Sequence, residues 1–220
     1  MFYSVRRVEQ GLTICGDGSL TILGTGDGIQ VENEDFTMES GTVSLGIPGD
    51  DAADNPVNEN GLDLGNGDVI IKGGELTIHA KGHGMDVNGD AVFCGGKVSI
   101  KSKPSYGVRA KKTVEIYGGD LWIEANVTGI HGKQITIHGG DLTVDGWRDV
   151  SAEEVTAEVT LPEGVEIKEI SGADVIDVTA GPLHIEAEHA CVNRFPGDHL
   201  CDGCGKAFLQ AIAQDGQILL

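Results

Sequence analysis

The stretch NGDVIIKGGELTIHAKGHGMDV, residues 66–87, holds three short segments of the kind that form β-strands. They are VII (69–71), GELTI (74–78) and GMDV (84–87), and glycine-rich turns separate them. An extended strand places successive side chains on opposite faces, so alternation of apolar and polar residues indicates a half-buried strand. We therefore interpret this stretch as three strands joined by tight turns.

Each segment recurs along the chain. Steps like GELTI begin at Gly18, Gly41, Gly74, Gly96, Gly119 and Gly140. Steps like GMDV begin at Gly28, Gly61, Gly84, Gly107, Gly129 and Asp149. Segments like VII occupy 36–38, 69–71, 91–93, 114–116 and 135–137. Within each of the first two sets the steps are 20 to 23 residues apart, except for one gap of 33. Both gaps fall at the same place, which indicates a single insertion near 46–60.

Units this short cannot bury an apolar face alone, so they must stack and share a continuous core. Three strands per unit predict an all-β fold, a right-handed single-stranded parallel β-helix of about six coils. The handedness follows from the general rule for parallel crossovers. We expect the glycines to supply positive φ at the corners. With aromatic residues at 5% of the chain, the core should be thin and aliphatic.

The repeat fades after residue 150, although 157–188 still alternates. We expect this segment to form terminal strands that cover the open end of the stack. The predicted division is a β-helix with capping strands over 1–183 and a small Cys/His-rich appendix over 184–220. A short helix is expected at 206–213.

The net charge of −20 argues against a nucleic-acid partner, because binding a phosphate backbone requires basic surface. No apolar run approaches the roughly 20 residues of a membrane span, so no membrane insertion is expected. The N-terminal stretch MFYSVRRVEQ lacks the apolar region of a signal peptide. This fits either a cytoplasmic protein or a piece of a longer exported chain. Because an acidic surface suits a secreted protein, we expect an extracellular or cell-surface location, with further domains of a longer surface protein as candidate partners.

Polar residues repeat in columns beside the GMDV-like strands. Adjacent coils should stack about 4.8 Å apart, which lines up side chains of equivalent position. The candidate ligand-binding residues in these columns are Asp63, His83, Asp86, Tyr106, Arg109 and His131. Tyrosine can stack on a sugar ring and arginine can pair with a uronate carboxylate. The alternative is a solvated polar face without a ligand.

The insertion GIPGDDAADNPVNENGLD is rich in carboxylates and amides. Calcium prefers six to eight oxygen ligands in flexible geometry. We therefore predict a calcium site at Asp50, Asp51, Asp54 and Asp63. A solvated acidic loop is the alternative.

The segment HACVNRFPGDHLCDGCGKAFLQ, residues 189–210, contains a Cys-x-x-Cys pair. Such a turn lets two thiolates face one zinc ion. The predicted zinc ligands are Cys191, Cys201 and Cys204 with His189 or His199. A disulfide or free thiols are the alternatives.

The pattern GDGIQV, TMESGTVSL and NGDVIIKGGELTIHAKGHGMDV resembles a family of bacterial surface β-helix domains that bind cellulose- and pectin-type polysaccharides. The resemblance covers about residues 12–150. It implies a non-catalytic carbohydrate-binding or attachment module for acidic or plant cell-wall polysaccharide, assisted by calcium.

A second set of motifs, GDD (49–51), GHG (82–84) and RAK (109–111), is similar in order to the polygalacturonase family. That resemblance implies a pectin-active glycosidase or lyase, in which Arg109 and Lys111 would hold the uronate carboxylate. The family's Asn-Thr-Asp motif is absent, and inverting hydrolysis needs an acid and a base about 6.5–9.5 Å apart. A structural stalk within a larger surface protein is a third hypothesis, and we favour the non-catalytic binding module.

Overall fold

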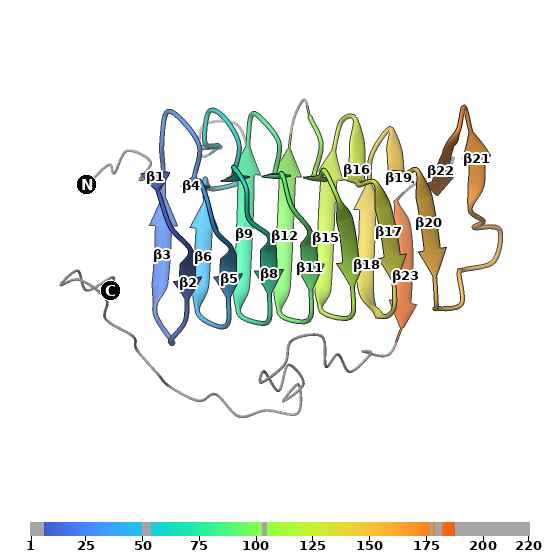
Figure 1. Ribbon diagram of the computed structural model, residues 1–220, viewed down its shortest axis with the longest axis horizontal. Coiled ribbons are helices and arrows are strands. Elements are labelled where there is room, and N and C mark those ends of the chain that lie inside the picture. The colour runs from blue at the N-terminus through green and yellow to red at the C-terminus, as the bar shows by residue number, and fades with distance from the viewer. Residues whose placement is uncertain (1–6, 50–53, 103–104, 177, 179–181, 188–220) are drawn as a thin grey trace.

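The computed structural model describes residues 7–49, 54–102, 105–176, 178 and 182–187, which form a β-solenoid. Strands of successive coils lie side by side along one long axis (Figure 1) and pair in parallel in three sheets, here called A, B and C. The predicted all-β parallel β-helix of about six coils is therefore confirmed.

Each coil contributes one strand to each sheet. Sheet A contains β1 (Arg7–Val8), β4 (Ile29–Val31), β7 (Leu62–Leu64), β10 (Met85–Val87), β13 (Val108–Ala110), β16 (Thr128–His131), β19 (Arg148–Ala152), β22 (Ala173–Ile176) and β21 (Lys168–Ile170). Sheet B contains β2 (Leu12–Ile14), β5 (Phe36–Met38), β8 (Val69–Ile71), β11 (Ala91–Phe93), β14 (Thr113–Ile116), β17 (Gln134–Ile137) and β20 (Glu154–Ala157). Sheet C contains β3 (Ser19–Ile22), β6 (Thr42–Leu45), β9 (Glu75–Ala80), β12 (Lys97–Ser102), β15 (Asp120–Ala125), β18 (Gly140–Asp145) and β23 (Leu183–Ala187).

The pairing register places equivalent residues of neighbouring coils directly opposite one another. Asp86 of β10 lies opposite Asp63 of β7 on one side and Arg109 of β13 on the other. Met85 is fully buried, whereas Asp86 next to it faces outward and is partly exposed. Because a shift of one residue would exchange the inner and outer faces, this register fixes which side chains form the outer surface of sheet A.

The core consists of the inward-facing residues of all three sheets and is mostly aliphatic, as expected. Phe36 and Phe93 are the only aromatic residues in the buried cluster formed by the described part of the chain. Other large, fully buried side chains include Met38, Leu76 and Ile100. Burial of this apolar surface is the main stabilising term that holds the coils together.

The glycines at the corners differ from the expectation that all of them supply positive φ. Gly96, at the start of β12, does so with φ of 81°. Gly84, which precedes β10, does not; instead, a Cβ there would lie 2.3 Å from Ile100 Cγ2 and 2.4 Å from the carbonyl oxygen of Gly107. Glycine is required at Gly84 because the neighbouring coil leaves no room for a side chain.

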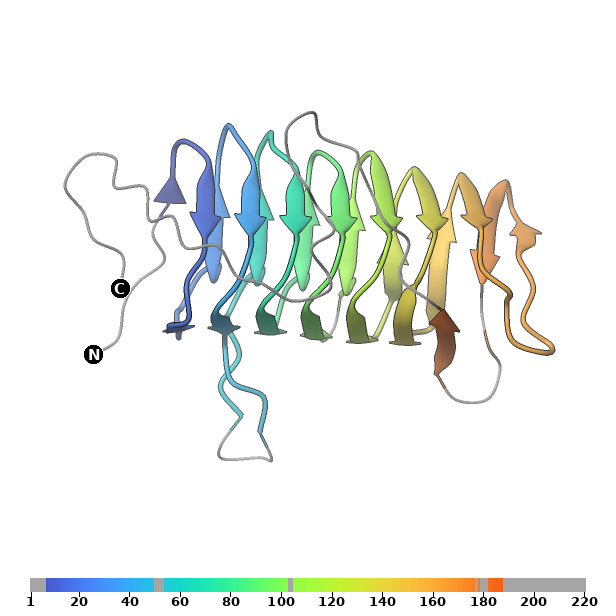
Figure 2. The same ribbon diagram turned by 90° about the horizontal axis from the view of Figure 1, so that it is seen from below.

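The insertion lies between β6 and β7, where the sequence spacing places it, and projects from the stack (Figure 2). An antiparallel bridge between Ile47 and Asn55 closes its base. Val57 is fully buried and pairs with Ala80 of β9, which ties the returning end of the insertion to the solenoid.

Parallel pairing between coils ends at β19 in sheet A and at β18 in sheet C. The strand β22 pairs antiparallel with β19, and β21 extends this part of sheet A. The strand β23 pairs antiparallel with β18 in sheet C. The predicted ligands Asp50, Asp51, His189, Cys191, His199, Cys201 and Cys204 and the helix expected at 206–213 lie outside the described residues.

Candidate functional site

The six candidate residues lie on the outer face of sheet A and on the corner where the chain passes from sheet C to sheet A. We call them the polar ladder: Asp63, His83, Asp86, Tyr106, Arg109 and His131. The register places Asp63, Asp86, Arg109 and His131 in one row across four successive coils. The sequence therefore predicted correctly which of these side chains are neighbours.

Arg109 and Asp86 form a two-point ion pair at the centre of the row. Nε of Arg109 donates to Asp86 Oδ1 at 2.9 Å, and Nη2 donates to Asp86 Oδ2. The side chains are 33% and 16% exposed. An arginine has five N–H donors and this pair uses two of them, so three have no hydrogen-bond partner within the described structure.

Three rings, those of His83, Tyr106 and His131, lie close together where the corner meets the outer face of sheet A. The centroid of Tyr106 lies 5.3 Å from that of His83 and 5.4 Å from that of His131. The guanidinium carbon of Arg109 lies 6.0 Å from the Tyr106 ring centre. The ladder therefore places an aromatic surface beside an arginine that is paired with a carboxylate.

Part of the corner column has a structural role. Asp27 Oδ1 accepts from the backbone N–H of Asn60 at 2.8 Å, and Asn60 Oδ1 accepts from that of His83 at 2.9 Å. His83 Nδ1 lies 2.6 Å from Ser105 Oγ and accepts from the Tyr106 N–H at 3.4 Å. These bonds satisfy backbone donors between coils, so His83 supports the position of Tyr106.

Burial shifts the ionisation of several of these groups. Burial, followed by the charge of Arg109, lowers the pKa of His83 below its usual value. Burial likewise lowers the pKa of His131. Burial, with the nearby charge of Asp86, raises the pKa of Asp63. The two imidazoles are therefore held in the neutral form at the pH at which free histidine begins to titrate.

The lowered pKa values of the two histidines predict a loss of stability on acidification. Because the folded pKa of His131 is lowered, its contribution is complete above the unfolded value of 6.5 and is lost as the pH falls through the folded pKa. We expect His131→Gln to lose less unfolding free energy than the wild type between about pH 7.5 and about pH 5. Urea unfolding at several pH values measures this difference. Parallel curves for the two proteins would contradict the assignment.

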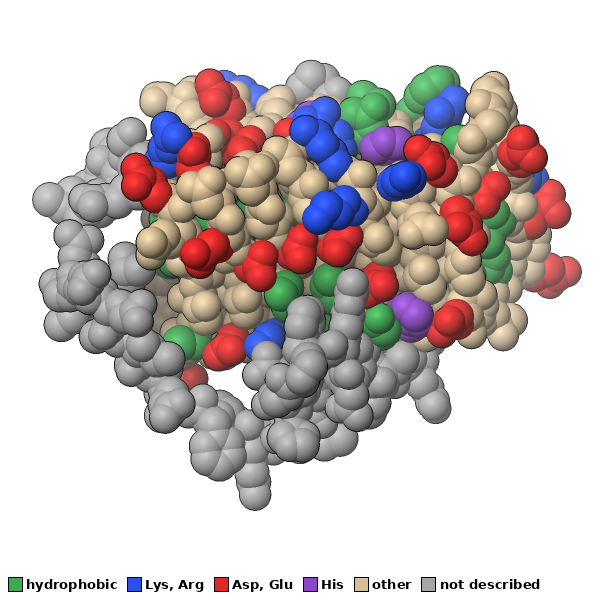
Figure 3. All heavy atoms as spheres, in the orientation of Figure 1, with side chains coloured by type: hydrophobic (Ala, Val, Ile, Leu, Met, Phe, Trp, Pro, Cys, Tyr) green, Lys and Arg blue, Asp and Glu red, His purple; other side chains and the backbone are tan. Residues whose placement is uncertain are grey.

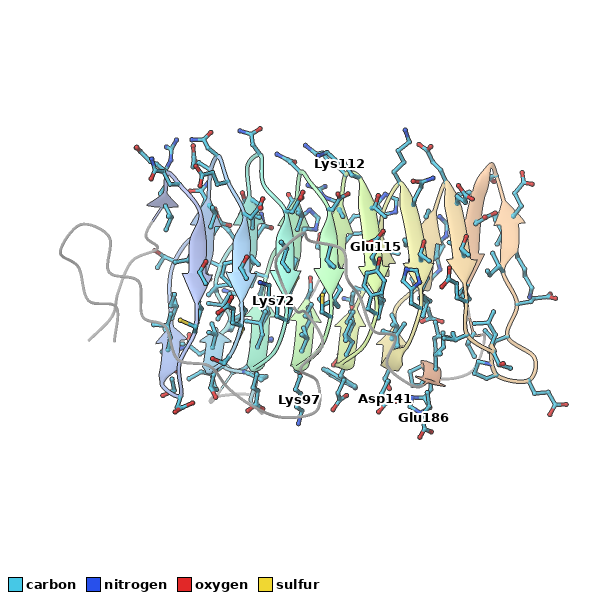
Figure 4. All side chains as sticks on the ribbon, turned by 60° about the horizontal axis from the view of Figure 1, so that its bottom comes forward. Lys72, Lys97, Lys112, Glu115, Asp141 and Glu186 are labelled. Carbon is cyan, nitrogen blue, oxygen red and sulfur yellow. The ribbon has the colours of Figure 1, made fainter. Side chains whose placement is uncertain are left out.

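An open groove of about 640 Å³ adjoins the ladder where sheet A turns into sheet B. Its lining includes Arg109, Lys111, His131, Lys133 and Glu153. Lys112 projects from the same edge of the stack (Figure 4), and its carbonyl oxygen accepts from the Lys133 N–H at 2.7 Å. Figure 3 shows acidic side chains spread over much of the visible face, with Lys and Arg gathered near its upper middle. We call Arg109, Lys111, His131 and Lys133 the basic groove.

Two residues that extend this surface were missed from the sequence. Lys133 follows Lys111 by one coil, and that spacing was a usable signal. Trp147 is 70% exposed, and the Arg148 guanidinium carbon lies 5.0 Å from its ring centre. Arg148 pairs with Thr128 in the strand register, and the carbonyl oxygen of Thr128 accepts from the N–H of Gly107, the residue after Tyr106. Trp147 therefore lies farther along the same corner.

The structure does not bring the predicted calcium ligands that it describes into one cluster. Asp54 Oδ1 lies 2.8 Å from Nε2 of His79, and this contact lowers the pKa of Asp54. Asp63 instead accepts from Asn60 Nδ2 at 2.8 Å on sheet A. Within the described ranges, no group of three or more His, Cys, Asp or Glu residues is placed to hold a metal. The calcium and zinc sites remain predictions.

The residues suggested by the polygalacturonase resemblance are spread over several features. Arg109 is bound to Asp86, Lys111 lines the basic groove, and His83 bonds to the neighbouring coil. Asp50 and Asp51 lie outside the described residues. The described residues of these motifs therefore contribute to a cationic and aromatic surface.

The fold and this surface define a β-solenoid with an extended, solvent-facing polar surface. A family model described as carbohydrate-binding domain-containing protein matches residues 57–197. The chain therefore belongs to this family of carbohydrate-binding domain-containing proteins. No curated protein and no solved structure shows significant similarity to it. The described part of the chain contains no helix that could span a lipid bilayer.

Proposed function

We propose that the polar ladder and the basic groove bind an acidic polysaccharide of the plant cell-wall type, without catalysis, at an extracellular or cell-surface location. The observation that carries this proposal is the grouping of Tyr106 and Arg109 on one coil with His131 on the next coil, beside two lysines. Membership of a carbohydrate-binding family supports it.

The chemistry of a uronic-acid polymer matches this arrangement. Tyr106 and Trp147 offer ring faces on which the C–H face of a pyranose can stack. The free donors of Arg109, with Lys111 and Lys133, can pair with carboxylates. Because coils repeat about every 4.8 Å, a polymer that lies along the stack meets a side chain of equivalent position on each coil.

The net charge of −20 does not prevent binding of an anionic polymer. At physiological ionic strength, charges separated by more than about 8 Å are largely screened. At contact distance, Lys111 and Lys133 therefore act on the polymer more strongly than the distant carboxylates of the solenoid do, and Asp86, which lies close by, is already paired with Arg109. Added salt should weaken binding, because the attraction is electrostatic.

The double variant Lys111→Gln with Lys133→Gln tests this proposal. We expect about tenfold weaker binding to polygalacturonate, because two partly exposed charge pairs of about 0.5–1 kcal/mol each are lost. Affinity electrophoresis in gels containing polygalacturonate measures the change.

Lys97→Gln with Lys168→Gln is the matched control, since it removes the same charge outside the groove. We expect this control to keep wild-type retardation. Equal weakening in both variants, or no retardation of the wild type, would refute the proposal.

A further inference from the structure

The outer face of sheet C carries a second regular row of polar side chains, on a different face of the solenoid from the polar ladder. We call it the hydroxyl row: Thr21, Ser44, Thr77, Ser99, Trp122 and Thr143. Each member lies directly opposite the next in the strand register, so the row is straight along the stack.

Trp122 interrupts this row of small hydroxyl residues with a large ring. Its neighbours on the chain, Leu121 and Ile123, are buried in the core, whereas Trp122 itself is 40% exposed. It lies opposite Ser99 on one side and Thr143 on the other. A broad apolar ring between hydroxyl groups matches a sugar, which has an apolar C–H face and a rim of hydroxyl groups.

The hydroxyl groups near Trp122 are positioned to bond to such a ligand. Thr143 Oγ1 lies 2.9 Å from Nδ1 of His184, which fixes the orientation of this hydroxyl group. In the described part of the structure, the side-chain hydroxyls of Thr77 and Ser99 have no hydrogen-bond partner. Hydroxyl groups both donate and accept, as sugar hydroxyls do.

The charges around Trp122 select against an anionic ligand. Asp120 and Glu124 flank it on β15, and Asp141 and Asp145 occupy the matching positions of β18. On the other side, the matching positions of β12 hold Lys97 and Lys101. Lys97, Asp141 and Glu186 all project from this edge of the stack in Figure 4. Carboxylates outnumber cations here, so a polyuronate is repelled where a neutral chain is not.

We infer that the hydroxyl row is a second glycan-binding site, which takes a neutral polysaccharide chain with Trp122 as its stacking platform. This goes beyond the proposed function, because it assigns a second ligand class to a different face. The two faces belong to different sheets, so both ligands can be bound at once. The protein would then bridge an acidic and a neutral polysaccharide.

The test compares Trp122→Ala with Trp122→Phe on gels that contain hydroxyethyl cellulose or polygalacturonate. Loss of a central stacking residue should weaken binding to the neutral polymer about tenfold or more. Trp122→Phe should keep most of it, since the ring is retained. Both variants should bind polygalacturonate like the wild type.

Three outcomes would overturn the inference: no binding of the wild type to the neutral polymer, unchanged binding by Trp122→Ala, or equal loss on both polymers. A wild-type dimer that Trp122→Ala converts to monomer, with neutral-polymer binding unchanged, would identify a self-association surface instead. Loss of polygalacturonate binding in the lysine variant tests the other site separately. The two proposals can therefore fail independently.

Discussion

Replacing Gly84 with alanine should lower the free energy of unfolding by about 3 kcal/mol, near the upper end of the usual cost of overpacking. The added Cβ would meet Ile100 Cγ2 at 2.3 Å and the Gly107 carbonyl oxygen at 2.4 Å. The second contact is with backbone, so two coils would have to move apart. Urea unfolding followed by circular dichroism measures the loss.

Gly18→Ala is the matched control, because a Cβ at Gly18 would meet no atom within 4 Å. We expect this variant to be as stable as the wild type or up to about 1 kcal/mol more stable, since alanine restricts the unfolded chain. If Gly84→Ala were as well tolerated as Gly18→Ala, the close stacking of coils at this corner would be wrong.

Tyr106→Ala should weaken polygalacturonate binding by about thirtyfold, the effect of losing a central contact worth about 2 kcal/mol. Tyr106 lies between His83 and His131 and next to Arg109, so its ring is the centre of the proposed surface. Affinity electrophoresis or calorimetry with oligogalacturonates measures the change.

Tyr106→Phe separates ring stacking from the hydroxyl group. It keeps the ring and should retain nearly all of the affinity. Strong binding by Tyr106→Ala, with the fold intact by circular dichroism, would place the ligand on another surface.

The fold could be predicted from the sequence because its signal repeats. The spacing of Gly61, Gly84 and Gly107 gives the coil length, and alternation within each coil gives the inner and outer faces. Together they give the register, so the neighbours of Asp86 followed directly. The insertion was found because it breaks an otherwise regular spacing.

The features that the sequence did not predict depend on interatomic distances, which the spacing of a sequence repeat does not specify. The sequence does not show that Arg109 binds Asp86 through two donors. Nor does it separate glycines with positive φ, such as Gly96, from those that leave room for the next coil, such as Gly84. Trp147 was missed because it lies at a corner, outside the strand pattern.

The calcium site stays a prediction, but the sequence did not show the contacts of its two described ligands. Asp54 and Asp63 are close in the sequence and both follow from the acidic composition of the insertion. In the structure Asp54 contacts His79 of sheet C, whereas Asp63 bonds to Asn60 on the outer face of sheet A. Proximity along the chain gave no information about which way each carboxylate points.

The most direct test of the central claim is an NMR titration of isotopically labelled protein with oligogalacturonate. Binding at the polar ladder and basic groove predicts chemical-shift changes centred on Tyr106, Arg109, Lys111 and His131, with Trp122 unaffected. Changes confined to residues outside these two features, or no changes at all, would contradict the account.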